Sequence, residues 1–357
     1  MTRFILRTPS NYHLMFKKKA KGLFAEVSHY QVRLARTDRL SAPVEVEALE
    51  TIPITTTAET RRAIEAFAGV QKGSYCQAQA SVYPRDRFIH RNSSESAART
   101  RAEDFATKTL STDLERKAKE TGFHVLNPST GQVYNATESP SRETLFVGAG
   151  KENLQEEQKR LIELGIYPTR LEISSISLFA GVKRAVVEED MDGSALVIEF
   201  SESTSYAYVV NLSGLALSHS IDFGVSAIAN SIQKELGLQD SLSARKVMLS
   251  KTFDFRDMAS TLLHDLIIQV RASTGQFEVQ TGKSVHYLFI PGLPSSLSWI
   301  SEILAEKLGM ERWKPTLSEW LNASGITVPD KIAERDDLYE FLPLFCQMAR
   351  LESPSSK

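Results

Sequence analysis

One short sequence pattern occurs twice in the chain, at positions about half its length apart. Phe24-Ala25-Glu26-Val27-Ser28 opens a predicted strand, turn and second strand, and Val197-Ile198-Glu199-Phe200-Ser201 opens another such unit. Each copy places a carboxylate at the end of an apolar strand and a serine two positions later. This repetition predicts two structurally related halves, each beginning with a β-hairpin. The tips of the two hairpins are expected to face the same cleft.

Length and charge narrow the classes of protein to which the chain can belong. At 357 residues it can bury a large core, and we expect two lobes because single cores rarely grow past roughly 250 to 300 residues. Its 42 basic residues nearly cancel its 44 acidic ones, so no excess charge attracts nucleic acid. Cys76 and Cys346 are far apart, and no Cys or His pair has metal-site spacing, which is typical of a reducing compartment.

The first 21 residues form a predicted basic and apolar arm. Six basic side chains lie there among apolar ones, without an acidic residue: Arg3, Arg7, Lys17, Lys18, Lys19 and Lys21. Such an arm either contacts an anionic membrane surface or a partner, or packs loosely on its own domain. No apolar run approaches the roughly 18 residues that cross a bilayer, and no signal peptide is recognisable, so we expect a cytoplasmic protein.

Strands followed by helices in both halves predict an α/β architecture. The expected units are the arm at 1–21, a first-lobe core at 22–84 and 166–192, an inserted subdomain at 85–165, a second-lobe core at 193–236 and 283–330, a second-lobe helical subdomain at 237–282 and a C-terminal tail at 331–357. Polar composition predicts that Asp86 to Ser96 is irregular. A helix from Phe255 is expected to end at Ser273, before a polar loop between Gly275 and Gly282.

Three stretches carry a resemblance to a known family. They are Leu145 to Glu152 continued by Leu161 to Glu172, Ile221 to Val225 with the helix that ends at Leu238, and Tyr287 to Gly309. In this order they resemble the actin-like ATPase superfamily, and more narrowly the PilM family of type IV pilus assembly proteins, relatives of the cell-division protein FtsA. The resemblance implies an actin-like, ribonuclease H-like duplicated fold of two lobes, with an inserted subdomain in the first lobe.

The chain departs from the family at its nucleotide site. An active member has Asp-Φ-Gly, where Φ is an apolar residue, at both hairpin tips and Gly-Gly-Gly after the adenosine strand; here these positions are Glu26-Val27-Ser28, Glu199-Phe200-Ser201 and Pro291-Gly292-Leu293. A Cβ at either tip hinders close approach of backbone amides to phosphate, and the longer Glu loosens magnesium geometry. We therefore expect a degenerate nucleotide site without catalytic residues, formed by Glu26, Ser28, His29, Glu199, Ser201, Pro291 and Gly292. The alternative, that Glu26 and Glu199 still hold magnesium and ATP weakly, stays open.

The resemblance also implies a function. It predicts a scaffold of a type IV pilus-like platform that binds the cytoplasmic tail of a PilN-like membrane protein, between residues 22–84 and the insert at 85–165, beside other platform proteins and without nucleic acid. One alternative is a catalytically active ATPase of the FtsA type that polymerises with ATP. Another is the cytoplasmic domain of a type II secretion platform protein, which is disfavoured because a membrane span is expected to follow such a domain.

Overall fold

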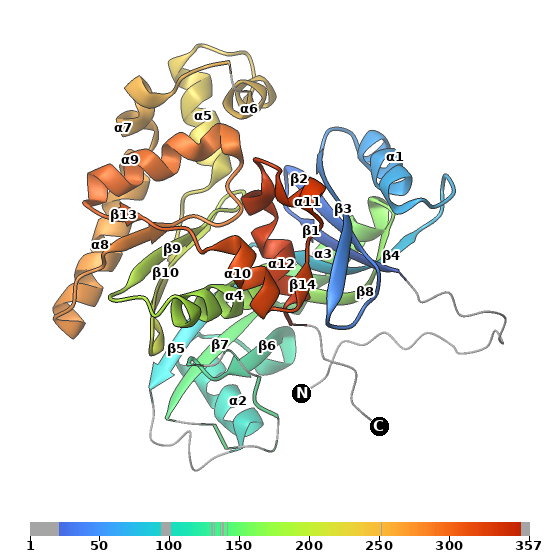
Figure 1. Ribbon diagram of the computed structural model, residues 1–357. Helices are drawn as coiled ribbons and strands as arrows, with labels where there is room; N and C mark the ends of the chain where they lie inside the picture. The colour runs from blue at the N-terminus through green and yellow to red at the C-terminus, as the bar shows by residue number, and fades with distance from the viewer. Residues whose placement is uncertain are drawn as a thin grey trace.

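The computed structural model describes residues 21–93 and 101–350, apart from residues 130, 132, 136, 138, 141 and 251. In this part of the chain two lobes are each built on a mixed β-sheet, and a smaller unit with its own sheet lies beside them (Figure 1). No helix of the described residues is both long and apolar enough to cross a membrane. The predicted basic arm lies outside the described residues except for Lys21.

The first lobe contains a six-stranded sheet in the order β14-β3-β2-β1-β4-β8. Its strands are β1 Gly22–Val27, β2 Gln31–Thr37, β3 Val44–Pro53, β4 Cys76–Val82, β8 Ile166–Ile173 and β14 Ile326–Thr327. Side chains alternate between the two faces of β1. Ala25 packs in the core that includes Ile64 of α1 (Thr57–Ala68) and Leu161 of α3 (Lys151–Glu163). Phe24 packs on the other side, with α4 (Ser174–Glu188) and α12 (Leu342–Met348).

The second lobe repeats this strand order in a five-stranded sheet, β11-β10-β9-β12-β13. Its elements are β9 Ala195–Glu199, β10 Ser205–Asn211, β11 Gly214–Ile221, α5 Val225–Glu235, α6 Ser241–Leu249, η3 Arg256–Met258, α7 Ala259–Leu262, α8 His264–Thr281, β12 Tyr287–Phe289, η4 Ser295–Leu297, α9 Ser298–Leu308 and β13 Glu311–Arg312. In both lobes an antiparallel hairpin is followed by a strand that pairs in parallel with the first one. The prediction of two related halves is therefore confirmed.

The inserted unit contains a three-stranded sheet in the order β5-β7-β6. Its elements are β5 Phe88–Ser93, α2 Ala102–Thr112, η2 Ala118–Glu120, β6 Thr121–Leu126 and β7 Glu143–Gly150. The prediction that 86–96 is irregular is wrong for β5. From His90 on, the residues of this strand alternate between half-buried and exposed positions. The insert also contacts the second lobe, because Arg91 donates to the Ala216 carbonyl and Ser218 donates to the Ile89 carbonyl.

The chain returns to the first lobe after its second-lobe elements. Strand β14 pairs with β3, and the Trp320 indole of α10 (Leu317–Ala323) donates to the Gly181 carbonyl at 3.0 Å. Short helices α11 (Asp330–Ala333) and η5 (Leu338–Phe341) lead to α12, whose seven residues are all buried. The structure differs from the expected division at 317–327, assigned to the second-lobe core, and at 338–348, assigned to the C-terminal tail, because both stretches bury apolar side chains against the first lobe.

Helix α8 continues where a loop was expected. It includes Gly275 and ends at Thr281, before Gly282, whose φ of 66° gives the left-handed turn that glycine adopts readily. Buried Ser273, Thr274 and Phe277 keep this stretch packed on the lobe despite the glycine.

Candidate functional site

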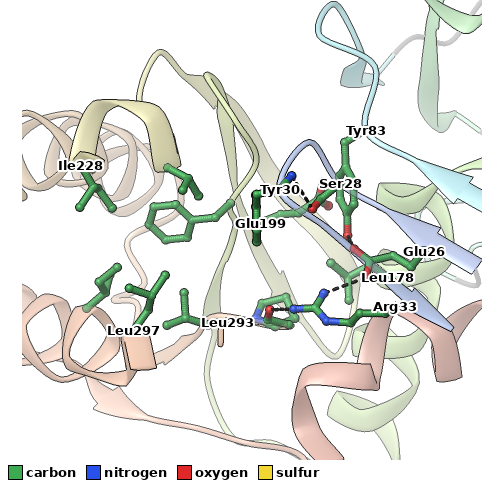
Figure 2. A pocket seen from close by; sticks show the side chains of 15 residues that line it. Glu26, Ser28, Tyr30, Arg33, Tyr83, Leu178, Glu199, Ile228, Leu293 and Leu297 are labelled. Atoms are coloured by element: carbon green, nitrogen blue, oxygen red, sulfur yellow. Dashed lines mark hydrogen bonds and ion pairs between the residues drawn. The ribbon is translucent and has the colours of Figure 1, made fainter. Parts of the chain in front are cut away.

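The two hairpin tips and the loop after β12 meet around one small cavity between the lobes (Figure 2). Five predicted site residues line it: Glu26, Ser28, Glu199, Pro291 and Gly292. Ser201 is buried nearby, where its hydroxyl accepts a hydrogen bond from Arg87. His29 lines a different pocket. The structure therefore brings the predicted residues together, except for His29.

Glu26 lies near the end of β1 and is 1% exposed. Its carboxylate accepts hydrogen bonds from the Tyr83 hydroxyl and from Arg33, each at 2.7 Å (Figure 2). Burial is the largest single influence and lowers the pKa of Arg33, but the interactions with Glu26, Tyr30 and Tyr83 together raise it overall. Burial, followed by the Glu26 charge, raises the pKa of Tyr83 well above its ordinary value. Glu26 therefore has both a charged partner and a neutral hydroxyl donor at neutral pH.

Glu199 ends β9 and is 2% exposed. The Ser175 hydroxyl, from the first turn of α4, donates to its Oε1 at 2.7 Å, and Arg87 Nη2 lies 3.1 Å from the same oxygen. The pKa of Glu199 is raised overall. Burial is the largest cause and the Glu26 charge adds to it, whereas Arg87 and Ser175 act in the opposite direction. Two buried carboxylates thus reach this region from opposite lobes, and each is paired with its own arginine.

The serines at the hairpin tips bind their own turns. Ser28 Oγ accepts from the amides of Tyr30 and Gln31 at 3.3 and 3.1 Å, and the Ser28 amide donates to the Gln31 carbonyl at 3.0 Å. In the other tip, the Ser201 hydroxyl donates to the Thr204 carbonyl. A phosphate loop needs backbone amides that point freely at oxygen atoms. At the first tip these three amides already have partners within the turn.

The space between the tips is too small for a nucleotide. It has a volume of about 20 Å³, room for about one water molecule, whereas small-molecule sites measure roughly 300–1,000 Å³. Leu293 lines it together with Leu297 of η4 and Ile228 of α5 (Figure 2). Among the described residues, no three His, Cys, Asp or Glu side chains come together as metal ligands. The residues present therefore do not fit a magnesium-bound nucleotide in this arrangement.

His29 follows Ser28 in the turn between β1 and β2. It lines a pocket of about 180 Å³ with Arg85 and with Asn153, Glu157 and Arg160 of α3. Burial, then the Arg160 charge, lowers the pKa of His29 to about 4. The imidazole is therefore neutral at pH 7. Arg160 also donates to the Ser28 carbonyl at 2.8 Å, which joins α3 to the first hairpin tip.

Sequence reasoning missed the two arginines, Arg33 and Arg87. For Arg33 a signal was available: a turn at 28–30 pairs Glu26 with Arg33 directly across the antiparallel hairpin, as the structure has it. For Arg87 there was none, because it follows β4 in a polar stretch and meets Glu199 only through the tertiary fold.

Comparison with known proteins identifies the fold class. No protein-family model matches the chain, and no curated protein matches it. The expected actin-like fold, with two lobes on duplicated sheets, is confirmed by the likeness to a solved chain of the PilM–PilN type IV pilus biogenesis complex. A protein of actin-like ATPase fold and unknown function from Bacteroides thetaiotaomicron is 9% identical, with a TM-score of 0.45 over 93% of this chain and 96% of that one.

A chain of the PilM–PilN type IV pilus biogenesis complex is more similar in structure. It is 15% identical and gives a TM-score of 0.65 over 92% of this chain and 97% of that chain. The resemblance to PilM is thus confirmed as a likeness of fold. The ethanolamine utilization protein EutJ from Carboxydothermus hydrogenoformans is 10% identical, with a TM-score of 0.44 over 92% of this chain and 89% of that one.

Proposed function

We propose that this protein is a cytoplasmic scaffold of a type IV pilus-like assembly platform, held at the inner membrane through its partners. In this proposal it binds the cytoplasmic tail of a PilN-like membrane protein and contacts other platform proteins. The observation that carries the proposal is the structural likeness to a chain of the PilM–PilN complex over nearly the whole length of both chains. The basic arm at 1–21, proposed as a membrane contact, lies outside the described residues except for Lys21.

Two strand edges support the tail site expected between the first lobe and the insert. In the described part of the chain, β8 ends the first-lobe sheet and β6 ends the inserted sheet, bridged further only where Leu126 meets Val133. Helix α3 contacts both β6 and β8. An extended tail can add its main chain to either edge, since edge strands present unpaired amides and carbonyls.

Peptide binding tests this proposal. The probe is a synthetic cytoplasmic tail of the PilN-like protein from the same genome, and affinity is measured by fluorescence anisotropy. Strand addition predicts that N-methylation of every second residue weakens binding at least about tenfold in one of the two alternating registers, and less in the other. Equal affinity in both registers contradicts strand addition, and no binding of the unmodified peptide contradicts the proposed partner.

Substitutions then locate the tail. Arg170→Glu reverses a charge on β8, and Arg62→Glu is the control because Arg62 is exposed on α1 of the same lobe. We expect Arg170→Glu to change the affinity and Arg62→Glu to leave it unchanged. If Arg62→Glu changes the affinity and Arg170→Glu does not, the tail binds away from β8.

The second part of the proposal is that the cleft is a degenerate nucleotide site, which makes the protein a pseudo-ATPase. Its support is the pairing of both tip carboxylates with arginines and the lack of space for a nucleotide. Phosphate release with Mg-ATP is the test, and sedimentation with and without ATP addresses the polymerising ATPase alternative. Saturable hydrolysis that Glu199→Ala abolishes, or ATP-dependent pelleting, would overturn this part.

A further inference from the structure

Arg33 joins the two lobes through a single guanidinium. It projects from β2 of the first lobe, and its side chain is 3% exposed. Nη1 donates to Glu26 on the neighbouring strand at 2.7 Å, while Nη2 donates to the carbonyl of Gly292 in the second lobe (Figure 2). Gly292 has a φ of 66°, in the left-handed region, which orients this peptide within the loop after β12.

Arg87 makes a second crossing. It follows β4, is 1% exposed, and lies between the rings of Tyr83 and Tyr206, with its Cζ 5.6 and 4.6 Å from their centroids. Its guanidinium is 3.1 Å from the Glu199 carboxylate and donates to Ser201 at 3.3 Å, both in the second lobe. Aromatic stacking and charge pairing together fix the planar guanidinium in place.

These contacts balance the charge of the cleft within the protein. Two buried carboxylates require two positive charges, because an unpaired carboxylate is strongly disfavoured away from water. Two guanidinium groups supply the same charge as one divalent cation. In addition, each guanidinium connects the first-lobe side of the cleft to the second lobe.

We infer that Arg33 and Arg87 are internal counterions that take the place of a metal-bound nucleotide and hold the lobes in one orientation. The orientation of the lobes is then a fixed property of the chain and does not respond to nucleotide. This inference rests on the degenerate cleft but is independent of the partner, so the peptide experiment above can fail or succeed separately.

Single-molecule energy transfer between the lobes tests the inference. Fluorophores are placed on cysteines introduced at Ala63, exposed on α1, and Val279, 88% exposed on α8. The native Cys76 and Cys346 are buried and so are protected from labelling. We expect one narrow transfer distribution for the wild type, unchanged by millimolar Mg-ATP. A shift of this distribution with Mg-ATP overturns the inference, and this arm requires no substitution in the cleft.

Arginine variants provide the second measurement. Arg33→Gln and Arg87→Gln are expected to broaden the distribution and to lower the mean transfer efficiency. Arg36→Gln is the matched control, because Arg36 lies on the same strand but, among the described residues, bonds only to Glu47 and to the Phe67 carbonyl, both in the first lobe. Should a Gln variant not fold, Arg33→Lys keeps the charge but is less able to reach Glu26 and Gly292 together, and is expected to broaden the distribution. If the transfer distributions of the Arg33 and Arg87 variants equal that of Arg36→Gln, the inference is overturned.

Discussion

At the scale of single residues, the neighbours of a carboxylate decide its role more than its type does. From the sequence, the extra methylene of Glu26 and the Cβ of Ser28 predict a weakened nucleotide site. The structure adds that the Ser28 hydroxyl binds its own turn and that Arg33 neutralises Glu26. Glu26 and Ser28 thus differ from the residues of a nucleotide site mainly because each already has a partner within the protein.

Breaking one of these pairs should be costly. Glu26→Gln removes the charge that compensates Arg33 inside the cleft, so we expect a loss of about 3–5 kcal/mol in the free energy of unfolding, as for other buried pairs that lose one partner. The measurement is urea unfolding followed by circular dichroism. Glu47→Gln is the control, because Glu47 pairs at the surface with Lys21 and Arg36 and should cost at most about 1 kcal/mol. Equal losses in the two variants would contradict the prediction.

At the scale of elements, local pattern predicted the strands and helices that have strong apolar periodicity. The two hairpins and α5 belong to this group. Strand β5 was missed because His90 to Ser93 are polar, and the helix predicted to end at Ser273 continues to Thr281. The pairing of β14 with β3 could not be predicted, since a strand of two residues carries no periodicity. The predicted site residues came together because the duplicated hairpins positioned them, whereas Arg87 depends on tertiary contacts.

Two helical glycines should respond to alanine in opposite ways. A Cβ on Gly275 of α8 meets no heavy atom within 4 Å, so Gly275→Ala should raise the free energy of unfolding by about 0.5–1 kcal/mol. A Cβ on Gly181 of α4 would clash with Cys346 Sγ, so Gly181→Ala should lower the free energy of unfolding, by about 1–3 kcal/mol. Urea unfolding of both variants is the measurement. The prediction is wrong if both change stability with the same sign.

At the scale of the whole molecule, one core connects the units. It includes Phe24 of the first lobe, Leu145 of the insert, Val197 of the second lobe and Phe345 of the returning segment. A second core, which contains Trp299, lies within the second lobe. Because β9 contributes Val197 to the first core and Ile198 to the second, unfolding of either core removes support from the other.

We therefore expect both lobes to unfold in a single transition. Fluorine NMR of protein labelled with 5-fluorotryptophan reports Trp299 in the second lobe and Trp320 in the shared core without substitution of either residue. Their native resonances should disappear at the same urea concentration. A Trp299 resonance that survives to a clearly higher concentration than that of Trp320 would show that the lobes unfold independently.

The return of the chain to its first lobe also sets an order for synthesis. Strand β1 is the first described element that the ribosome makes, and α12, which covers the Phe24 face of the sheet, is the last. Domains generally fold during translation once their parts have emerged. Here the newborn chain leaves the part of this apolar sheet face that α4 does not cover exposed to water or to a chaperone until α12 has been made.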